Sequence, residues 1–353
     1  MTRETGAKLF SLFLALIIIC GAELALRLWP PAILRDRADG HLQSIISILR
    51  RDNELFWTQR GNLHQSFFGA PLATDEFGLR NPAHYITQSG PDREFRILIL
   101  GASPSFGWGV ADEQTYPRLL EKQLSARWPC PIRVINASVI GYSSWQGLAL
   151  LEKYADIFRP NQIIASYMIN DVSRERFFYS GAAPDKELRV RCAGFFNFLD
   201  NLALAKFAAG LASRCRAERF PGHDFPARVS LQDFEDNHRE FIRIARQRHA
   251  GIDFLFIPFR FPPTGRDDYR AQELLAVMRR EMAYLDRLKR ISQNYHIGLV
   301  DMAAPFHARY SDYYLVERGD HIHPNPRGQR LIADELTRVM LARLRDGIAG
   351  NNK

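Results

Sequence analysis

Three side chains suited to acyl transfer stand far apart in the chain, at Ser103, Asp320 and His323. Ser103 follows an apolar run, and Gly101 and Gly107 beside it allow the tight backbone that presents a small nucleophile. His323 can take the Ser103 proton, and Asp320 can bind the other ring nitrogen and hold the imidazole in the right tautomer. These residue types predict a serine nucleophile with a histidine base.

The oxyanion that forms during acyl transfer needs hydrogen-bond donors. Three candidates follow predicted strands: the backbone N–H groups of Ser103 and Gly141, and the side-chain amide of Asn170. One such donor typically lowers the barrier by ~3 kcal/mol. Ligand sites of open parallel sheets lie outside the carboxyl ends of the strands, so these donors can converge in one crevice with Ser103.

The elements that must position these residues alternate along the chain. The apolar run from Phe95 to Leu100 predicts a strand buried on both faces. Further strands are predicted at 132–136, 162–168, 252–259 and 297–301, and helices at 112–128, 143–157, 231–249, 271–294 and 327–345. This alternation predicts an α/β fold with a parallel sheet sandwiched by helices.

The sequence blocks around these residues resemble those of the SGNH, or GDSL, hydrolase family over about residues 93–345. The blocks read Gly101-Ala102-Ser103, Asn136 to Gly141, Asn170-Asp171 and Asp320-x-x-His323, in the family's order. The resemblance implies a flavodoxin-like three-layer α/β/α sandwich. It also implies a nucleophilic Ser103, oxyanion donors Gly141 and Asn170, and an Asp320–His323 pair, and we expect neither cofactor nor metal.

Two positions depart from the family pattern. Ala102 stands where the family usually has Asp, and Met168 where it usually has Gly. Neither residue lies in the proton-transfer path. Ala102 removes a carboxylate from the nucleophile loop, so the rigidity of that loop is in question.

Each block also has an explanation without function. The stretch from Asp320 to Gly328 could be a turn before the last helix, and His321 and His323 could be taken for a metal pair, although a third ligand is missing. Asn136 and Asn170 could simply close strands by bonding the backbone. Four blocks in the family's order favour the enzyme.

The N-terminus carries an apolar stretch from Leu9 to Leu28. We predict a transmembrane anchor at residues 9–29, ended by Trp29 at the interface. A cleaved signal peptide is the alternative, because the uncharged part covers only Leu9 to Ala22. Flanking charge does not decide the orientation. The resemblance to membrane-anchored bacterial members implies an inner-membrane, single-pass protein with a periplasmic or extracellular domain.

Besides the tail at 1–8 and the anchor, the chain is predicted to fall into two parts, the second with an insertion. A juxtamembrane region covers 30–92, helical around 41–51 and then turn-rich, and an SGNH hydrolase domain covers 93–348. An insertion at about 173–228 interrupts the domain and carries apolar residues at helical spacing, among them Phe195 and Phe198. It is either a helix packed over the sheet or a mobile or membrane-contacting element.

Composition limits the classes of partner. The 353 residues carry a net charge of +8, but the cations are scattered and match no nucleic-acid motif, so we expect no nucleic-acid partner. A surface of this charge tolerates anionic membranes or polyanionic substrates. Cys192 and Cys215 either pair in an oxidising compartment or remain free thiols.

The sequence thus predicts a membrane-anchored serine esterase or O-acyltransferase that forms an acyl-enzyme. Its expected substrates are small esters or ester-linked acyl groups, acetyl foremost, of cell-envelope glycans, with polysaccharide-assembly proteins as further partners. The alternative is an inactive glycan-binding or assembly protein of the same fold.

Overall fold

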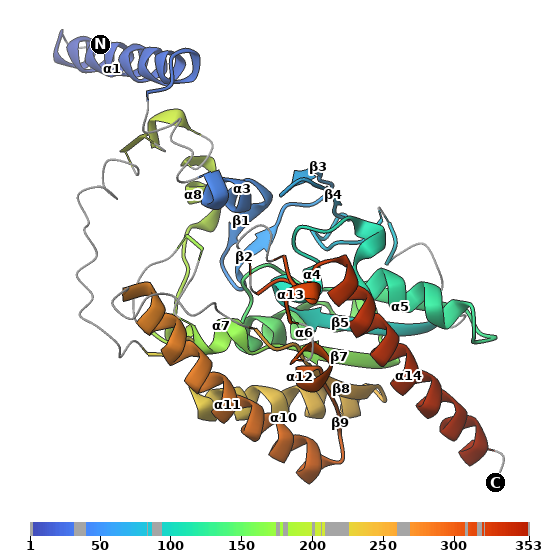
Figure 1. Ribbon diagram of the computed structural model, residues 1–353. Coiled ribbons are helices and arrows are strands. Elements are labelled where there is room, and N and C mark those ends of the chain that lie inside the picture. Colours follow the sequence, from blue (N-terminus) through green and yellow to red (C-terminus); the bar gives the residue numbers. More distant parts are fainter. Residues whose placement is uncertain are drawn as a thin grey trace. The chain divides into compact units, whose positions relative to one another are not determined.

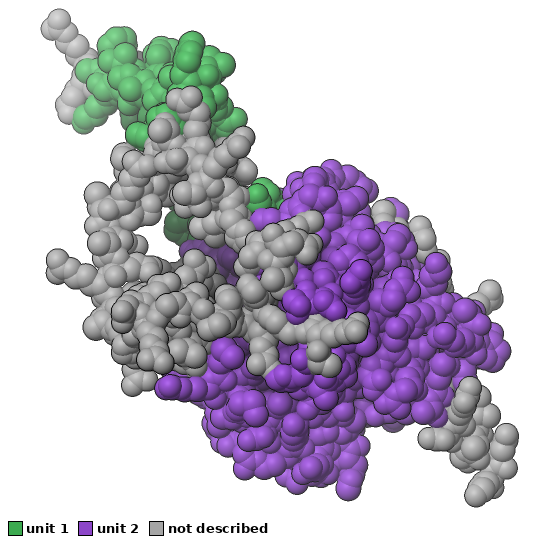
Figure 2. All heavy atoms as spheres, in the orientation of Figure 1, with its two compact units in different colours: residues 1–53, 190–221 green, residues 54–189, 222–353 purple. Residues whose placement is uncertain are grey.

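A computed structural model of the chain shows how these elements are arranged (Figure 1). The structure describes residues 3–31, 40–82, 84–86, 94–173, 177–178, 183–199, 202–205, 207–208, 226–259, 269–307, 310–315, 320 and 322–351. Figure 2 colours the two compact units into which the chain divides. The first holds residues 1–53 and 190–221, and the second holds residues 54–189 and 222–353.

The second unit is built on a five-stranded parallel sheet with the strand order β6-β5-β7-β8-β9. This is a flavodoxin-like order: β6 is added on one side of β5, and β7, β8 and β9 follow on the other side. Within β5, Leu98 is paired with Ile135 on one side and with Ile163 on the other. The strands are β5 (Phe95–Gly101), β6 (Ile132–Asn136), β7 (Gln162–Ser166), β8 (Gly251–Phe256) and β9 (Gly298–Asp301).

Helices cover both faces of this sheet, as the alternation predicted. Ile97 and Ile99 join one buried cluster with residues of α5 (Tyr116–Ser125) and α14 (Pro326–Asn351), two helices that pack together (Figure 1). Because side chains alternate along a strand, Leu98 faces the other side, where α6 contacts β5 and α10 contacts β8. The helices are α6 (Ser144–Phe158), α10 (Leu231–Gln247) and α11 (Tyr269–Tyr295). The predicted three-layer fold is confirmed.

Several predicted boundaries were wrong, and prolines explain two of them. The helix expected at 112–128 is a short 3-10 turn, η3 (Asp112–Gln114), followed by extended Thr115 and then α5, with Pro117 in its first turn. Proline fits a first turn because it has no N–H to donate. Strand β8 ends at Phe256, before Pro258, which cannot donate to a ladder.

The upstream region was predicted to be turn-rich after residue 51, but it contains three short strands. They are β2 (Phe56–Gln59), β3 (His64–Phe67) and β4 (Ala70–Ala73), and β3 and β4 form an antiparallel hairpin. Trp57, Leu72 and Leu79 are buried. Residues 54–92, which the sequence assigned to the juxtamembrane region, fall in the same compact unit as the sheet.

The first unit contains the apolar N-terminal helix α1 (Arg3–Leu28), with α3 (Gly40–Ile48), β1 (Leu49–Asp52) and α8 (Ala193–Leu199). Residues Ala7–Leu28 have a mean hydropathy of 2.5 and are long and apolar enough to cross a membrane, a property that anchors and signal sequences share.

The predicted insertion is helical at α8, where Phe195 and Phe198 are each 61% exposed. Leu211, a further apolar residue of the insertion, lies outside the described residues, as does Cys215. Cys192 is an exposed free thiol in the structure, which favours the free-thiol alternative over pairing with Cys215.

Candidate active site

Ser103 opens the short helix α4 (Ser103–Phe106) directly after β5 and is 8% exposed. The turn into this helix is tight. A Cβ on Gly101 would lie 2.4 Å from Ser105 Oγ, so the position has room only for glycine. Gly107 ends α4 in the left-handed region with a φ of 88°, which glycine adopts without strain. The sequence thus places a hydroxyl at the carboxyl end of a central strand.

His323 lies within hydrogen-bond distance of this hydroxyl. Ser103 Oγ donates to His323 Nε2 over 2.8 Å, and His323 Nδ1 donates to Asp320 Oδ2 over 2.6 Å. The other carboxylate oxygen, Asp320 Oδ1, accepts the backbone N–H groups of Ile322 and His323 at 2.9 and 3.0 Å. The structure therefore brings the three predicted residues into one chain of hydrogen bonds.

The electrostatics of this chain keep Asp320 ionised. Burial raises the pKa of the Asp320 carboxyl, but the hydrogen bond and charge of the His323 ring and the two backbone donors outweigh burial. The net result is a pKa below the usual value for an aspartate. An ionised carboxylate at Nδ1 leaves Nε2 as the nitrogen that faces Ser103, which is the arrangement a general base requires.

An aromatic stack holds the His323 ring from the side. The Trp108 indole lies parallel to the imidazole, with ring centroids 4.5 Å apart and an interplanar angle of 8°. Phe68 stacks on the other face of Trp108 at 4.7 Å, and Phe67 meets Trp108 edge-on at 4.9 Å. The indole therefore covers one face of the His323 ring. No pattern in the sequence singled out Trp108.

The oxyanion candidates lie after the neighbouring strands. Gly141 follows β6 with a φ of 77°, and Asn170 lies in α7 (Ile169–Val172) after β7. One N–H of the Asn170 amide donates to the Tyr142 carbonyl at 2.9 Å. Among the described residues, the backbone N–H groups of Ser103 and Gly141 donate to no other group. Both are available to a ligand.

The sequence that builds this site matches the model of a known family. Residues 99–331 match the model of the GDSL-like lipase/acylhydrolase family. The chain belongs to this family. It is a serine ester hydrolase. No curated protein matches the chain in sequence.

Solved structures with a similar fold have low identity to this GDSL-family esterase. EstA, a psychrotrophic esterase from Pseudoalteromonas sp., is 18% identical, with a TM-score of 0.44 over 71% of this chain and 98% of that one. LAE5, from the metagenome of Lake Arreo, is 20% identical, with a TM-score of 0.43 over 69% and 93%. A catalytic mutant of Axe2, an acetylxylan esterase from Geobacillus stearothermophilus, is 18% identical, with a TM-score of 0.44 over 69% and 93%.

Within the esterase, α4 is held through its C-terminal end. Ala102, the position where the family usually has Asp, is the N-cap residue of α4 and offers no side-chain cap. At the other end, buried Arg80 donates to the carbonyls of Phe106, Gly107 and Val110, with distances of 3.2 Å to Phe106 and 2.6 Å to Val110. Arg80 lies before the residues that match the family model.

Asn136 bonds backbone groups near the end of its strand, as the explanation without function predicted. Its side chain donates to the Ser105 carbonyl at 3.2 Å and accepts the Ser138 N–H at 3.2 Å. Its own N–H donates to the Asn81 side chain at 2.9 Å. Asn136 thus ties the end of β6 to α4 and to the upstream segment, and it has a supporting role in the esterase.

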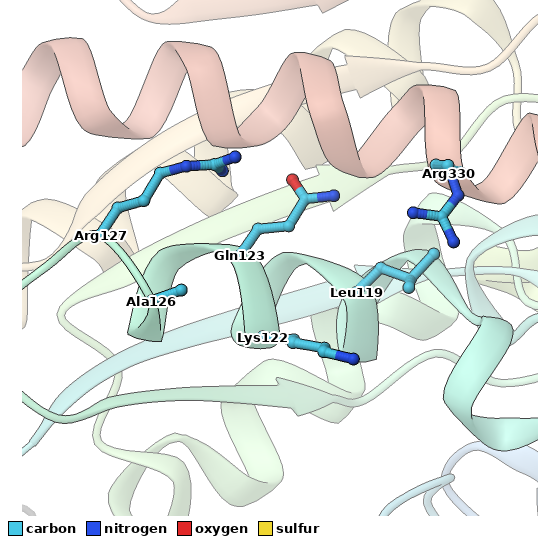
Figure 3. Close-up of a pocket in the computed structure, with 6 residues that line it drawn as sticks. All are labelled: Leu119, Lys122, Gln123, Ala126, Arg127 and Arg330. Atoms are coloured by element: carbon cyan, nitrogen blue, oxygen red, sulfur yellow. The ribbon is translucent and has the colours of Figure 1, made fainter.

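A hollow between α5 and α14 lies apart from these residues. Figure 3 shows the side chains that line it: Leu119, Lys122, Gln123, Ala126, Arg127 and Arg330. It contains cations and an amide but no hydroxyl, thiol or carboxylate, so it lacks the side chains on which a serine hydrolase depends. Across the described residues, no three His, Cys, Asp or Glu side chains gather as a metal site would need; His321 is outside that set.

Proposed function

We propose that this GDSL-family esterase works through Ser103 as nucleophile, His323 as general base and Asp320 as the carboxylate that orients the base. The observation that carries the proposal is the continuous contact from Asp320 Oδ2 through the His323 ring to Ser103 Oγ, at 2.6 and 2.8 Å. Both distances lie in the range required for proton transfer. The stack of Trp108 on His323 supports the same roles.

The reaction proceeds in two halves. His323 takes the Ser103 proton as Oγ bonds to the ester carbonyl carbon, and the tetrahedral oxyanion then expels the alcohol, which receives the proton from His323. In the second half, His323 takes a proton from water as the water oxygen bonds to the acyl carbon. The tetrahedral oxyanion then expels Ser103 Oγ, which receives the proton, and the acid is released. The backbone N–H groups of Ser103 and Gly141 and the second N–H of Asn170 receive the oxyanion.

The substrate class and the location form the second part of the proposal. We infer an acetyl ester of a cell-envelope glycan or a small ester, cleaved outside the cytoplasm by a domain that residues 9–29 anchor to the inner membrane. The apolar span of 22 residues within α1 supports the anchor, and the net charge of +8 suits an acidic glycan. With a sugar hydroxyl in place of water, the same acyl-enzyme yields O-acyl transfer, and polysaccharide-assembly proteins would supply the acceptor.

The proposal is tested on the full chain with a fluorophosphonate and a short acetyl ester. Wild-type protein should be labelled at Ser103 and cleave the ester, and Ser103→Ala should lose both. Folded wild-type protein that is neither labelled nor active would favour the glycan-binding alternative.

Transfer and location need separate measurements. Acetyl groups that appear on an added oligosaccharide, in place of free acetate, would identify a transferase. A reporter that fluoresces only in the cytoplasm, fused after Lys353, should remain dark, and a bright fusion would reverse the proposed orientation.

A further inference from the structure

The direction of the Gly141 N–H is set by the peptide unit that joins Ile140 to Gly141. A trans peptide is planar, so its N–H and C=O point in opposite directions. A group that holds the Ile140 carbonyl therefore also aims the Gly141 N–H. This matters at Gly141 because glycine has no side chain to restrict its backbone, and its φ of 77° lies in a region that glycine leaves easily.

Trp57 is the residue that holds this carbonyl. Its indole Nε1–H donates to the Ile140 carbonyl at 2.9 Å, and the Trp57 side chain is fully buried. The Trp57 carbonyl in turn accepts the hydroxyl of Tyr142 at 2.7 Å. Trp57 thus hydrogen-bonds to the residues on both sides of Gly141.

The indole also limits the space around Gly141. A Cβ at that position would lie 3.3 Å from Trp57 Cζ2 and 2.4 Å from the Phe177 ring, which meets Trp57 edge-on at 5.5 Å. The backbone therefore comes close to the indole, and only glycine fits. Packing and hydrogen bonding act on the same peptide.

Arg228 fixes the next peptide unit. Its Nη1 donates to the Gly141 carbonyl at 2.8 Å, and its Nη2 pairs with Asp185 Oδ2 at 3.0 Å. The Arg228 guanidinium also lies 5.4 Å from the centre of the Trp57 ring. With both flanking peptide units held, rotation about Gly141 is restricted on either side.

We propose that Trp57 is a positioning residue for ester cleavage: its indole N–H, acting through the Ile140–Gly141 peptide, aims the Gly141 N–H at the oxyanion. A hydrogen bond accepted by the Ile140 carbonyl also polarises the N–H of the same peptide and strengthens it as a donor. The inference rests on the proposed role of Gly141. Trp57 lies 42 residues before the first residue of the family match at residue 99, so the family match does not assign it a role.

The test replaces Trp57 by Phe, which removes the N–H donor and keeps an aromatic ring. The matched control is Trp145→Phe, because Trp145 stacks on Phe56 at 5.0 Å and is another indole of the same unit. Turnover is expressed per site labelled by fluorophosphonate at end-point, which corrects for misfolded protein. A short alkylboronic acid serves as the probe, since Ser103 Oγ adds to boron and the resulting tetrahedral anion places an oxygen where the oxyanion forms.

Trp57→Phe should lower kcat per labelled site by ~10- to 50-fold, less than the loss of a whole oxyanion donor. KM should stay within about twofold, because the contact strengthens in the transition state. Boronate affinity should fall by a similar factor to kcat, whereas Trp145→Phe should change neither. A general packing defect would lower the labelled fraction without changing turnover per site or boronate affinity.

If Trp57→Phe matches Trp145→Phe in both readouts, the inference is overturned. If Trp57→Phe does not fold, Tyr142→Phe decides, because it removes the bond to the Trp57 carbonyl and leaves the indole present. A smaller parallel loss of kcat and boronate affinity would support the inference, and no loss would overturn it. Wild-type protein that is never labelled would instead remove the proposed function, so the two failures are distinguishable.

Discussion

The two sides of Ser103 are built in different ways. On the base side, Asp320 and His323 are three residues apart, and one turn supplies both the ring contact and the backbone donors that hold the carboxylate. On the oxyanion side, Gly141 and Asn170 follow different strands, and the nearest hydrogen bonds that hold Gly141 come from Trp57 and Arg228. Most polar contacts on the base side thus come from within one turn, with the Trp108 stack beside it, whereas the oxyanion donors depend on residues spread over the unit. Changes on the base side should therefore alter turnover with little effect on stability, and changes to the residues that support the oxyanion side should alter both.

The largest effect is expected on the base side, from Asp320→Asn. The amide keeps an oxygen for the two backbone donors but presents N–H to the His323 ring, which favours the wrong tautomer. We expect kcat to fall by ~10⁴-fold, the magnitude that the same substitution has in serine proteases, with only a small drop in the thermal midpoint. Steady-state kinetics and a melting curve on one preparation check both halves.

His321→Ala is the control for that substitution and should be mild. A crippling His321→Ala together with a harmless His323→Ala would show that the base is assigned to the wrong histidine.

On the oxyanion side, Asn170→Ala should rank next. It removes one of the proposed donors, and such a loss typically costs about 10²–10³-fold in kcat. It also removes the hydrogen bond to the Tyr142 carbonyl, so the melting temperature should fall as well, unlike in Asp320→Asn. Equal stability of the two variants would erase the contrast between the two sides.

Arg80→Met tests the support of the nucleophile helix. It removes the guanidinium donor from the carbonyls of Phe106, Gly107 and Val110. The free energy of unfolding should fall by about 2–4 kcal/mol in urea titrations, and kcat per labelled site should fall by roughly tenfold through the loosened Ser103 turn. Arg338→Met, at a side chain that is 69% exposed, is the matched loss of an arginine and should be nearly silent.

Ala102→Asp should have a smaller effect, and in the opposite direction on stability. An Asp at the N-cap can accept an N–H of the first turn of α4, which typically stabilises by about 1 kcal/mol. Turnover should change only a few-fold, because nucleophile, base and oxyanion donors come from other residues. Labelling that appears only in Ala102→Asp would mean that the natural chain is an inactive relative.

The smallest effect concerns acid stability. The pKa of Asp320 is lowered in the folded protein, so this carboxylate contributes stability above the usual aspartate pKa and loses that contribution as pH falls through the folded-state pKa. Asp320→Asn should lack this dependence. The difference in free energy of unfolding between the two proteins should therefore shrink below about pH 4, and a constant difference from pH 7 to pH 3 would contradict it.

The difference between the two sides also decides what the sequence alone could predict. Ser103, Asp320 and His323 were recognisable because chemistry-bearing side chains stand at strand ends or at a short fixed spacing. Strand β6 has the predicted bounds, since its apolar residues are buried in the sheet. Trp57 and Arg80 could not be found this way, because a side chain that bonds a distant backbone carbonyl leaves no pattern in sequence. Here that distance is 83 residues for Trp57.

The upstream strands were missed for a related reason. Each of β2, β3 and β4 has four residues, too few to show a clear alternation of apolar and polar side chains. The helix predicted at 112–128 was too long because Asp112 to Thr115 are good helix-start residues, and Pro117 was not given its weight as a first-turn residue.

The separation of 220 residues between Ser103 and His323 has a consequence for the synthesis of the protein on the ribosome. At about 5–20 residues per second, the ribosome delivers the nucleophile roughly 10–45 s before the base. The emerging chain thus carries a serine with no partner to remove its proton. If His323 is the base proposed above, ester cleavage begins only once the turn that holds it has been synthesised and has docked, and the nascent chain before that point is chemically silent.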